Sequence, residues 1–341
     1  MNRVKLALNI CTYKREQILI KNLEVLKGSD FYNPSNSRYY NKLDVFVIDN
    51  ASELSLESFP DFHLFHNPNT GGSGGFQRGI EEIRKFDDYT HVIFMDDDVS
   101  FEMSSFYLLY DFLETVNKEN ADRPVAGRML DLDNPNIQWT AAEKWNAGDI
   151  KHVEFLRDIS DHANPYIPGK VIYDADADYG GFWFCCYPYS YVKDNDLLPF
   201  FLHCDDVEYG LRYGKKPIII EGVHVWHETW DKKMSPVIMY YDIRNTLFVN
   251  QIYGCGQSLP ELYDEWKKRI MSYREKNDTC SEYVVIKAMS DYIKGMEYIK
   301  TRPSDKIHNS IKYISASKIK NILMYKTVCR RIEKKIANDQ T

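Results

Sequence analysis

The sequence predicts an α/β protein, in which helices flank a mostly parallel sheet and a helical C-terminal region follows. Over the first 120 residues, short apolar runs alternate with segments whose apolar residues recur at helical spacing. Polar or glycine-rich clusters follow these apolar runs, as they do where ligands meet the carboxyl ends of parallel strands. Beyond residue 250 the remaining segments have helical periodicity. Together these observations indicate a ligand-binding sheet with a helical appendage.

The composition is that of a globular protein. The 341 residues are 44% hydrophobic and 27% charged. No apolar run reaches the roughly 18 residues that would span a membrane, and residues 1–9 lack the apolar core of a signal peptide. Seven cysteines at irregular positions predict reduced thiols. We therefore expect a cytoplasmic protein, either dissolved or peripheral on the inner face of the cell membrane.

The N-terminal part is expected to alternate strands with helices. Apolar runs predict strands at residues 4–10, 43–48 and 64–65. Leu19 and Leu23 mark a helix after the first strand, and the helix that contains Ile80 follows the third. This alternation places the ends of successive strands at one edge of the sheet.

Two polar clusters follow these strands. Residues 67–75 are rich in glycine and precede a helix, so their backbone can approach a phosphate that the helix N-terminus favours. The segment matches neither standard glycine-rich nucleotide motif, and a flexible turn is the alternative. Asp49 ends the second strand, where it can accept a hydrogen bond from a base or form a turn.

Three consecutive carboxylates, Asp96, Asp97 and Asp98, end the strand at residues 90–95. Alternate side chains of an extended chain share a face, so Asp96 and Asp98 are expected to point one way and Asp97 the other. Two hard oxygen ligands on one side suit Mg²⁺ or Mn²⁺, particularly an ion that also contacts phosphate. An acidic turn is the alternative interpretation.

The segment from residue 104 to 190 predicts a helix at 104–117, a strand at 125–130 and an aromatic strand around Trp183. Aromatic rings here are either core or a platform for the apolar face of a sugar. Both interpretations stay open for Trp183.

A second carboxylate pair, Asp205 and Asp206, follows this aromatic region. A carboxylate in a partly apolar cleft can act as a general base, whereas one at a helix start commonly caps the helix. The strand at residues 217–221 leads to His224 and His227, and one histidine can complete a two-carboxylate site for Mn²⁺.

The C-terminal region is expected to contain helices at residues 236–253, 260–275, 281–300 and 305–337. Arg244, in the first of them, either holds a phosphate or lies on the surface. Residues 306–341 carry a net charge of +7, which leaves −14 for the rest of the chain. A basic amphipathic helix indicates contact with an anionic membrane surface, and packing on the body or an oligomer interface is the alternative.

Six motifs, in this order along the chain, resemble those of the inverting glycosyltransferases of family two, which have the GT-A fold. They are Cys11–Arg15, Asp49–Asn50, Gly71–Gly79, Asp96–Asp98, Asp205–Glu208 and His227. Within that family the chain is most similar to bacterial galactofuranosyltransferases, through the Asp triplet, Gly180–Cys185, Asp205–Glu208 and Val225–His227. The resemblance covers about residues 4–250 and implies a Rossmann-like sheet.

The domain boundaries are predicted from the same resemblance. Residues 1–250 would form the GT-A catalytic domain, with a nucleotide-binding half at 1–120 and an acceptor-binding half at 121–250. Residues 251–341 would form a helical region with a basic tail.

The resemblance also implies a role for each candidate residue. The donor nucleotide-sugar would contact Thr12, Tyr13, Arg15, Asp49, Asn69, Gly71, Gly72, Asp96 and Asp97. Asp96, Asp98 and His227 would hold Mn²⁺ or Mg²⁺. Asp206 would be the catalytic base with Asp205 assisting, and the acceptor would contact Trp183, Phe182, Glu208 and Trp226. Cys204 departs from the pattern, because the similar enzymes carry Trp before the Asp pair.

The expected activity is transfer of a sugar, with galactofuranose the preferred choice, from a UDP-sugar to a glycan or lipid-linked acceptor in cell-surface polysaccharide synthesis. A rhamnosyltransferase that uses dTDP-rhamnose is the alternative within this class. A phosphohydrolase or nucleotidyltransferase would instead gather carboxylates around two metals about 4 Å apart. A carbohydrate-binding protein without catalysis is a third possibility. No nucleic-acid partner is expected, and an oligomer is possible.

Overall fold

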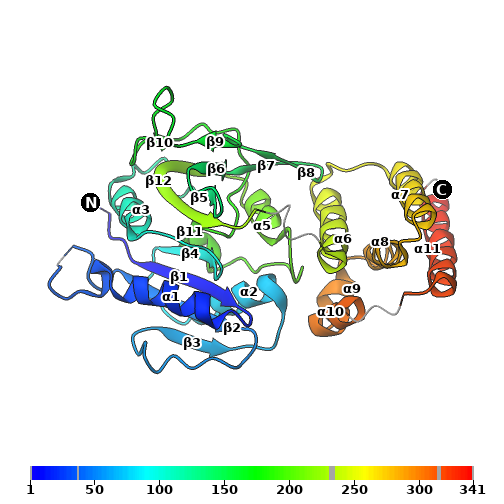
Figure 1. The fold of residues 1–341 in the computed structure, drawn as a ribbon, viewed down its shortest axis with the longest axis horizontal. Coiled ribbons are helices and arrows are strands. Elements are labelled where there is room, and N and C mark those ends of the chain that lie inside the picture. The colour runs from blue at the N-terminus through cyan, green and yellow to red at the C-terminus, as the bar shows by residue number, and fades with distance from the viewer. Residues whose placement is uncertain (1, 37, 230–234, 313–315, 340–341) are drawn as a thin grey trace. The chain divides into compact units, whose positions relative to one another are not determined.

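The computed structural model describes residues 2–36, 38–229, 235–312 and 316–339 (Figure 1). The chain divides into two compact units. Unit 1 comprises Met1–Trp145, Asp149–Leu198 and Asp205–Lys232, and unit 2 comprises Asn146–Gly148, Pro199–Cys204 and Lys233–Thr341. The predicted boundary after residue 250 falls inside helix α6 (Pro236–Tyr253), which belongs to unit 2.

The strands lie in unit 1, apart from the end of one hairpin. They are β1 (Leu6–Thr12), β2 (Leu43–Asp49), β3 (His63–His66), β4 (His91–Asp96), β5 (Val125–Asp131), β6 (Ile137–Thr140), β7 (Glu143–Asn146), β8 (Asp149–His152), β9 (Arg157–Asp158), β10 (Val171–Ile172), β11 (Cys185–Pro188) and β12 (Ile218–His227).

The helices of unit 1 are α1 (Glu16–Lys27), the 3₁₀ turn η1 (Asp30–Tyr32), α2 (Gly71–Ile83), α3 (Met103–Thr115), α4 (Tyr189–Val192) and α5 (Asp205–Tyr213). Those of unit 2 are α6, α7 (Leu259–Glu275), α8 (Thr279–Tyr292), α9 (Met296–Thr301), α10 (Ser304–Lys312) and α11 (Lys318–Asp339).

The main sheet has the strand order β10-β12-β5-β11-β4-β1-β2-β3 (Figure 1). The pairs β4–β1, β1–β2, β2–β3 and β5–β12 are parallel, and β11 is antiparallel to both β4 and β5. The carboxyl ends of β1, β2, β4 and β12 therefore lie at the same edge of the sheet. This confirms the predicted α/β class with a mostly parallel sheet and a helical C-terminal region.

Helices cover both faces of this sheet because its strands are buried on both sides. In β1, Leu6, Leu8 and Ile10 pack in the core cluster that contains residues of α1 and α3. Ala7, on the opposite face, packs in the cluster that contains residues of α2, α4 and α5. Such nearly continuous apolar runs are typical of parallel strands between two helical layers.

The glycine-rich segment differs from its prediction as a loop before a helix. Residues 71–75 form the first turns of α2 itself. A Cβ added at Gly75 would lie 2.0 Å from Cys11 Sγ, and one at Gly79 would lie 2.0 Å from Asn9 Oδ1. The missing side chains let α2 pack directly on β1, so these glycines serve close packing of helix and strand.

Two predicted elements at the C-terminus are divided. The helix predicted at 281–300 is interrupted at Gly295, which has φ of 88° and separates α8 from α9. The helix predicted at 305–337 consists of α10 and α11, and residues 313–315 between them lie outside the described residues. Trp266, Ile270, Met289 and Ile332 belong to the apolar core that α7, α8 and α11 share.

The strand predicted at 217–221 extends to His227, because β12 pairs with β5 along most of its length. None of the described helices combines the length and apolar character needed to cross a lipid bilayer.

Candidate active site

Asp96, Asp98 and His227 converge at the carboxyl edge of the sheet in unit 1. Each offers a ligand atom, and these atoms all lie within 4.8 Å of one another. His227 Nε2 lies 3.0 Å from Asp98 Oδ1 and 3.8 Å from Asp96 Oδ2. Two carboxylates and one imidazole form a donor set that accommodates Mn²⁺ or Mg²⁺. The residues present therefore fit a divalent metal.

The other nitrogen of His227 is already oriented. His227 Nδ1 lies 2.7 Å from the carbonyl oxygen of Glu228. A carbonyl can only accept, so Nδ1 carries a hydrogen, and Nε2 is the nitrogen that faces the two carboxylates and would offer its lone pair to a metal. Such a contact on the far side of a histidine ring fixes it for metal binding.

A backbone bridge brings His227 to the Asp triplet across two intervening strands. Ser100 N donates to Trp226 O and Trp226 N donates to Ser100 O, both at 2.8 Å. Residues 97–99 thereby cross from the end of β4 to the end of β12. The histidine, 129 positions from Asp98 in the chain, becomes its neighbour.

Asp97 lies apart from this triad. Its carboxylate accepts from Thr12 Oγ1 at 2.6 Å and from Arg15 Nη1 at 2.8 Å. Burial raises the pKa of Asp97, while Arg15 and Thr12 oppose that rise. Asp97 thus fixes the loop after β1, and the same Arg15 Nη1 also lies 3.2 Å from Asp98 Oδ2.

Asn22 is a supporting residue that the sequence did not reveal. It lies on the buried face of α1, and its Nδ2 donates to Asp97 O at 3.2 Å and to Val99 O at 2.9 Å. The sequence signal was a polar residue in register with Leu19, Leu23 and Leu26. A buried asparagine on an apolar stripe needs a hydrogen-bond partner, and here the partner is the loop of the metal site.

Asp49 forms a turn in this structure. Its carboxylate accepts backbone N–H groups of Ala51, Glu53 and Leu54 at 2.7–2.8 Å. Although burial alone would raise the pKa of Asp49, these bonds hold it below the usual value. The residue predicted to contact a base therefore shapes the loop at residues 50–54.

A cavity of about 450 Å³ opens beside this loop. Thr12, Arg15, Asp49, Glu53 and Leu54 are among the residues that line it. Its size is within the range of small-molecule sites, and it adjoins Asp97 through Thr12 and Arg15.

The remaining residues predicted at the donor lie around these elements. Tyr13 is exposed. Gly71 and Gly72 begin α2, and Gly71 N donates to Asn69 Oδ1 at 3.1 Å. The Asn50 side chain holds the same turn by donating to Gly71 O at 2.9 Å. The N-terminus of α2 is thus presented near the ends of β1 and β2.

Asp205 and Asp206 form the first turn of α5 and are partly exposed. The charge of Asp205 affects the thiol of Cys11, at the end of β1. Burial raises the pKa of Cys11, and the negative charges of Asp97, Asp96 and Asp205 raise it further. Charges from both carboxylate clusters thus act on the Cys11 thiol at the end of β1.

Two residues predicted to contact the acceptor lie in the interior. Phe182 is 4% exposed and stacks on Phe94 with ring centroids 4.6 Å apart. Glu208 is 3% exposed, and its carboxylate pairs with Arg212 at 2.9 Å. The aromatic core holds Phe182 and the ion pair holds Glu208, and their contact with an acceptor stays a prediction.

The two tryptophans predicted there are only partly buried. Trp183 Nε1 donates to Gly127 O at 2.8 Å, and Trp226 Nε1 donates to Pro135 O at 3.0 Å. Each indole is anchored at its nitrogen and retains some accessible surface.

Arg244 matches neither prediction made for it. It is 1% exposed, and its Nη2 donates to Phe200 O at 2.6 Å. The guanidinium is neither on the surface nor available to a phosphate, because it holds the backbone of a loop inside unit 2.

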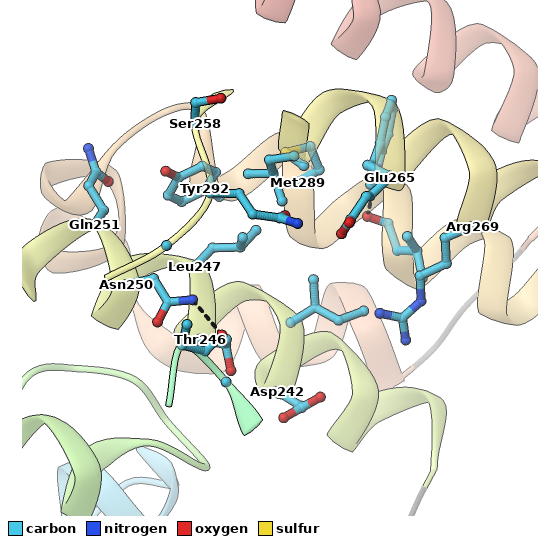
Figure 2. Close-up of a pocket in the computed structure, with 18 of the residues that line it drawn as sticks. Asp242, Thr246, Leu247, Asn250, Gln251, Ser258, Glu265, Arg269, Met289 and Tyr292 are labelled. Atoms are coloured by element: carbon cyan, nitrogen blue, oxygen red, sulfur yellow. Dashed lines mark hydrogen bonds between the residues drawn. The ribbon is translucent and has the colours of Figure 1, made fainter. Parts of the chain in front are cut away.

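Unit 2 contains a separate cavity of about 970 Å³ between α6, α7 and α8 (Figure 2). Leu247 and Trp266 contribute apolar surface, and Asp242, Asn250 and Arg269 contribute polar groups. Neither carboxylate cluster of unit 1 lines it.

Comparison with known proteins agrees with this arrangement. Residues 8–166 match the model of glycosyl transferase family 2. Galactofuranosyltransferase GlfT2 of Mycobacterium tuberculosis is 27% identical over 293 residues, and the match covers 74% of this chain and 44% of that protein. GlfT2 of Mycolicibacterium smegmatis is 30% identical over 258 residues, with 69% and 38% covered. The chain thus spans less than half the length of these curated relatives.

Among solved structures, residues 1–349 of S. aureus TarS align over 97% of this chain and 92% of theirs, with 15% identity and a TM-score of 0.49. From the family match and the two relatives, this chain belongs to glycosyl transferase family 2 and is related to galactofuranosyltransferases.

Proposed function

We propose that the chain transfers galactofuranose from UDP-galactofuranose to a glycan or lipid-linked acceptor, with inversion at the anomeric carbon. The observation that carries this proposal is the Asp96, Asp98 and His227 triad at the same sheet edge as the Asp205–Asp206 turn. The names of the two relatives support the choice of sugar. The finding of one metal triad among the described residues favours this reading over a two-metal phosphohydrolase.

The donor would bind along the ends of β1, β2 and β4. Asp96, Asp98 and His227 would hold Mn²⁺ or Mg²⁺, which neutralises charge on the departing diphosphate when bound. Arg15 would contact the nucleotide beside the cavity that Thr12 and Asp49 line.

Asp206 would act as the general base. It would remove the proton from an acceptor hydroxyl, whose oxygen then forms a bond to the anomeric carbon as the bond to UDP breaks on the opposite face. One base and no enzyme nucleophile are needed for inversion. Asp205 would assist by its negative charge.

The experiment that tests this function is calorimetry with UDP in the presence and absence of Mn²⁺. We expect UDP to bind much more tightly with Mn²⁺, and Asp98→Asn to weaken that binding by about tenfold or more. The exposed Asp176→Asn is a matched control and should bind UDP as the wild type does. UDP binding that does not respond to the metal would contradict the proposal.

The donor sugar is tested separately. UDP-galactofuranose, UDP-galactopyranose and dTDP-rhamnose are offered with a mixture of glycan acceptors, and released nucleotide is measured by mass spectrometry. Release from UDP-galactofuranose alone is expected. Release from dTDP-rhamnose alone would establish the rhamnosyltransferase instead.

We further propose that α11 brings the protein to the inner surface of the cell membrane. The outer face of α11 exposes Ile319 and Leu323, which are 74% and 62% accessible. Lys326 and Arg330 follow on the same exposed side, while Ile332 packs inward. Apolar side chains beside cations fit an anionic lipid surface. A second copy of the chain is the alternative occupant of this face.

A further inference from the structure

The segment Pro199–Cys204, which leads directly into the Asp205–Asp206 turn, has an unusual backbone. Phe201, His203 and Cys204 have φ of 73°, 66° and 66°. Non-glycine residues rarely adopt positive φ, and such conformations persist only where surrounding groups hold them. Three such residues lie within the five positions before Asp206, the proposed base.

Helix α6 holds this segment through its carbonyl groups. Asn245 Nδ2 lies 2.7 Å from Leu202 O, 2.8 Å from His203 O and 3.2 Å from Phe200 O. Arg244 Nη2 donates to Phe200 O at 2.6 Å. Both side chains are almost completely buried, and each donates to a carbonyl of this loop.

The two side chains also fix each other. Arg244 Nε donates to Asn245 Oδ1 at 2.9 Å, and Arg244 Nη1 donates to the Tyr240 hydroxyl at 3.3 Å. With its oxygen engaged, the Asn245 amide can turn only its NH₂ group toward the loop.

Side chains of the segment are held as well. His203 Nε2 lies 2.9 Å from Asp242 Oδ1. Phe201 stacks on Tyr241 and on His308, with ring centroids 5.1 Å and 4.4 Å away. Asp242 reaches the loop from the part of α6 that also lines the cavity in Figure 2.

Segment and α6 both belong to unit 2, and Asp205 follows Cys204 directly in the chain. We propose that Asn245 and Arg244 are positioning residues that hold the strained Pro199–Cys204 segment and thereby set the first turn of α5 with Asp205 and Asp206. The inference rests on the proposed function of Asp206 as the base. A general base acts only within hydrogen-bond reach of its proton, so a loosened turn costs turnover more than donor binding.

The test compares Asn245→Ala with a matched control in the full-length protein. Asn321 is equally buried in unit 2, and its Nδ2 donates to Thr279 O and Glu282 Oε2. With UDP-galactofuranose, Asn245→Ala is expected to lower kcat by about tenfold or more, while the Kd for UDP with Mn²⁺ stays within about twofold. Asn321→Ala is expected to leave kcat within about twofold.

Asp242→Asn provides a second variant that tolerates substitution better, because the Asp242 side chain is 37% exposed. It removes the charge that faces His203 and is expected to lower kcat without weakening UDP binding. Unchanged kcat in both Asn245→Ala and Asp242→Asn would overturn the proposal, as would an equal loss in Asn321→Ala.

Hydrogen exchange separates this inference from the proposed function. Amides of Phe201–Val207 should exchange faster in Asn245→Ala than in the wild type and should be unaffected in Asn321→Ala. A wild-type protein that transfers no sugar would refute the function. Unchanged amide exchange in Asn245→Ala would show that α6 does not hold the Pro199–Cys204 segment, whatever the activity.

Discussion

Asp97 differs from its two neighbours although all three carry the same functional group. Asp96 and Asp98 group with His227, while Asp97 accepts from Thr12 and Arg15. The sequence predicted this grouping from an extended chain, but β4 ends at Asp96 and residues 97 and 98 form a turn. The identity of the groups that receive Asp97 could not be foreseen, because they come from a different strand end.

Asp206 is expected to be essential for turnover and dispensable for donor binding. Replacement by Asn preserves the shape of the side chain but removes its basicity, so kcat should fall by roughly 10²–10⁴-fold. UDP affinity with Mn²⁺, measured by calorimetry, should stay near the wild-type value. Asp205→Asn should lose less activity than Asp206→Asn, and wild-type turnover by Asp206→Asn would refute the assignment.

His224 is expected to make the protein acid-sensitive. Burial, together with the nearby Arg128, lowers the pKa of His224 to about 4. The Tyr166 hydroxyl lies 3.1 Å from Nδ1 and accepts from Gly222 N, so it donates to the neutral ring. Between pH 6.5 and pH 4, His224 is protonated in the unfolded chain but stays neutral in the folded chain. The contribution of neutral His224 to the free energy of unfolding is therefore fully present above pH 6.5 and is lost as the pH falls toward 4.

The contribution of His224 to this loss is up to about 3 kcal/mol. His224→Gln cannot titrate, and its free energy of unfolding in urea should fall less between pH 7 and pH 4.5. His162, which is exposed, provides the control, because His162→Gln should keep the wild-type pH dependence. Equal acid sensitivity in both variants would contradict this assignment.

Helix α2 can lie close to β1 because its glycines have no side chains. Gly75 and Gly79 bring the helix against Cys11 and Asn9 of β1, and Asn9 Nδ2 donates to Phe76 O at 2.9 Å. That hydrogen bond fixes Asn9, so it cannot move aside for a larger residue. The place of α2 at the donor edge therefore depends on Gly75, which the sequence predicted in a glycine-rich loop, and on Gly79 in the helix that follows.

Gly79→Ala should destabilise the protein although alanine is the better helix former. The helix propensity of alanine contributes about 1 kcal/mol, whereas forcing a methyl group into the contact with Asn9 costs roughly 1–3 kcal/mol. The melting temperature should fall. Gly28→Ala, where the nearest atom would be 3.4 Å away and φ is −74°, should leave it nearly unchanged. A stabilised Gly79→Ala would show that α2 shifts at no cost.

The whole molecule separates its charges along the chain, with an acidic body and a basic C-terminal region. If α11 meets an anionic membrane, replacing Ile319 and Leu323 by Ser should weaken cosedimentation with vesicles that contain anionic lipid. A Lys300→Ser variant, in the exposed last turn of α9, should behave as the wild type. Unchanged sedimentation of the double variant, with a shift from dimer to monomer, would assign the face to a second copy.

Much of the fold and part of the site follow from local properties. Apolar periodicity located α3 and α6 nearly to the residue, and α6 coincides with the predicted range 236–253. The two carboxylate pairs were visible because several acidic residues follow a buried run. Breaks inside helical patterns were less visible, as at Gly295, because the pattern continues on either side of the glycine.

The sequence by itself determined that three aspartates follow one another at the end of a buried strand, since this depends only on neighbouring residues. The family resemblance already implied that His227 joins Asp96 and Asp98, and strand pairing in the tertiary structure brings them together. Only the tertiary structure decided that Glu208 and Phe182 are interior and that Arg244 holds a loop. Each of these depends on contacts between residues far apart in the chain. Such contacts are fixed by strand pairing and packing, which local composition does not encode.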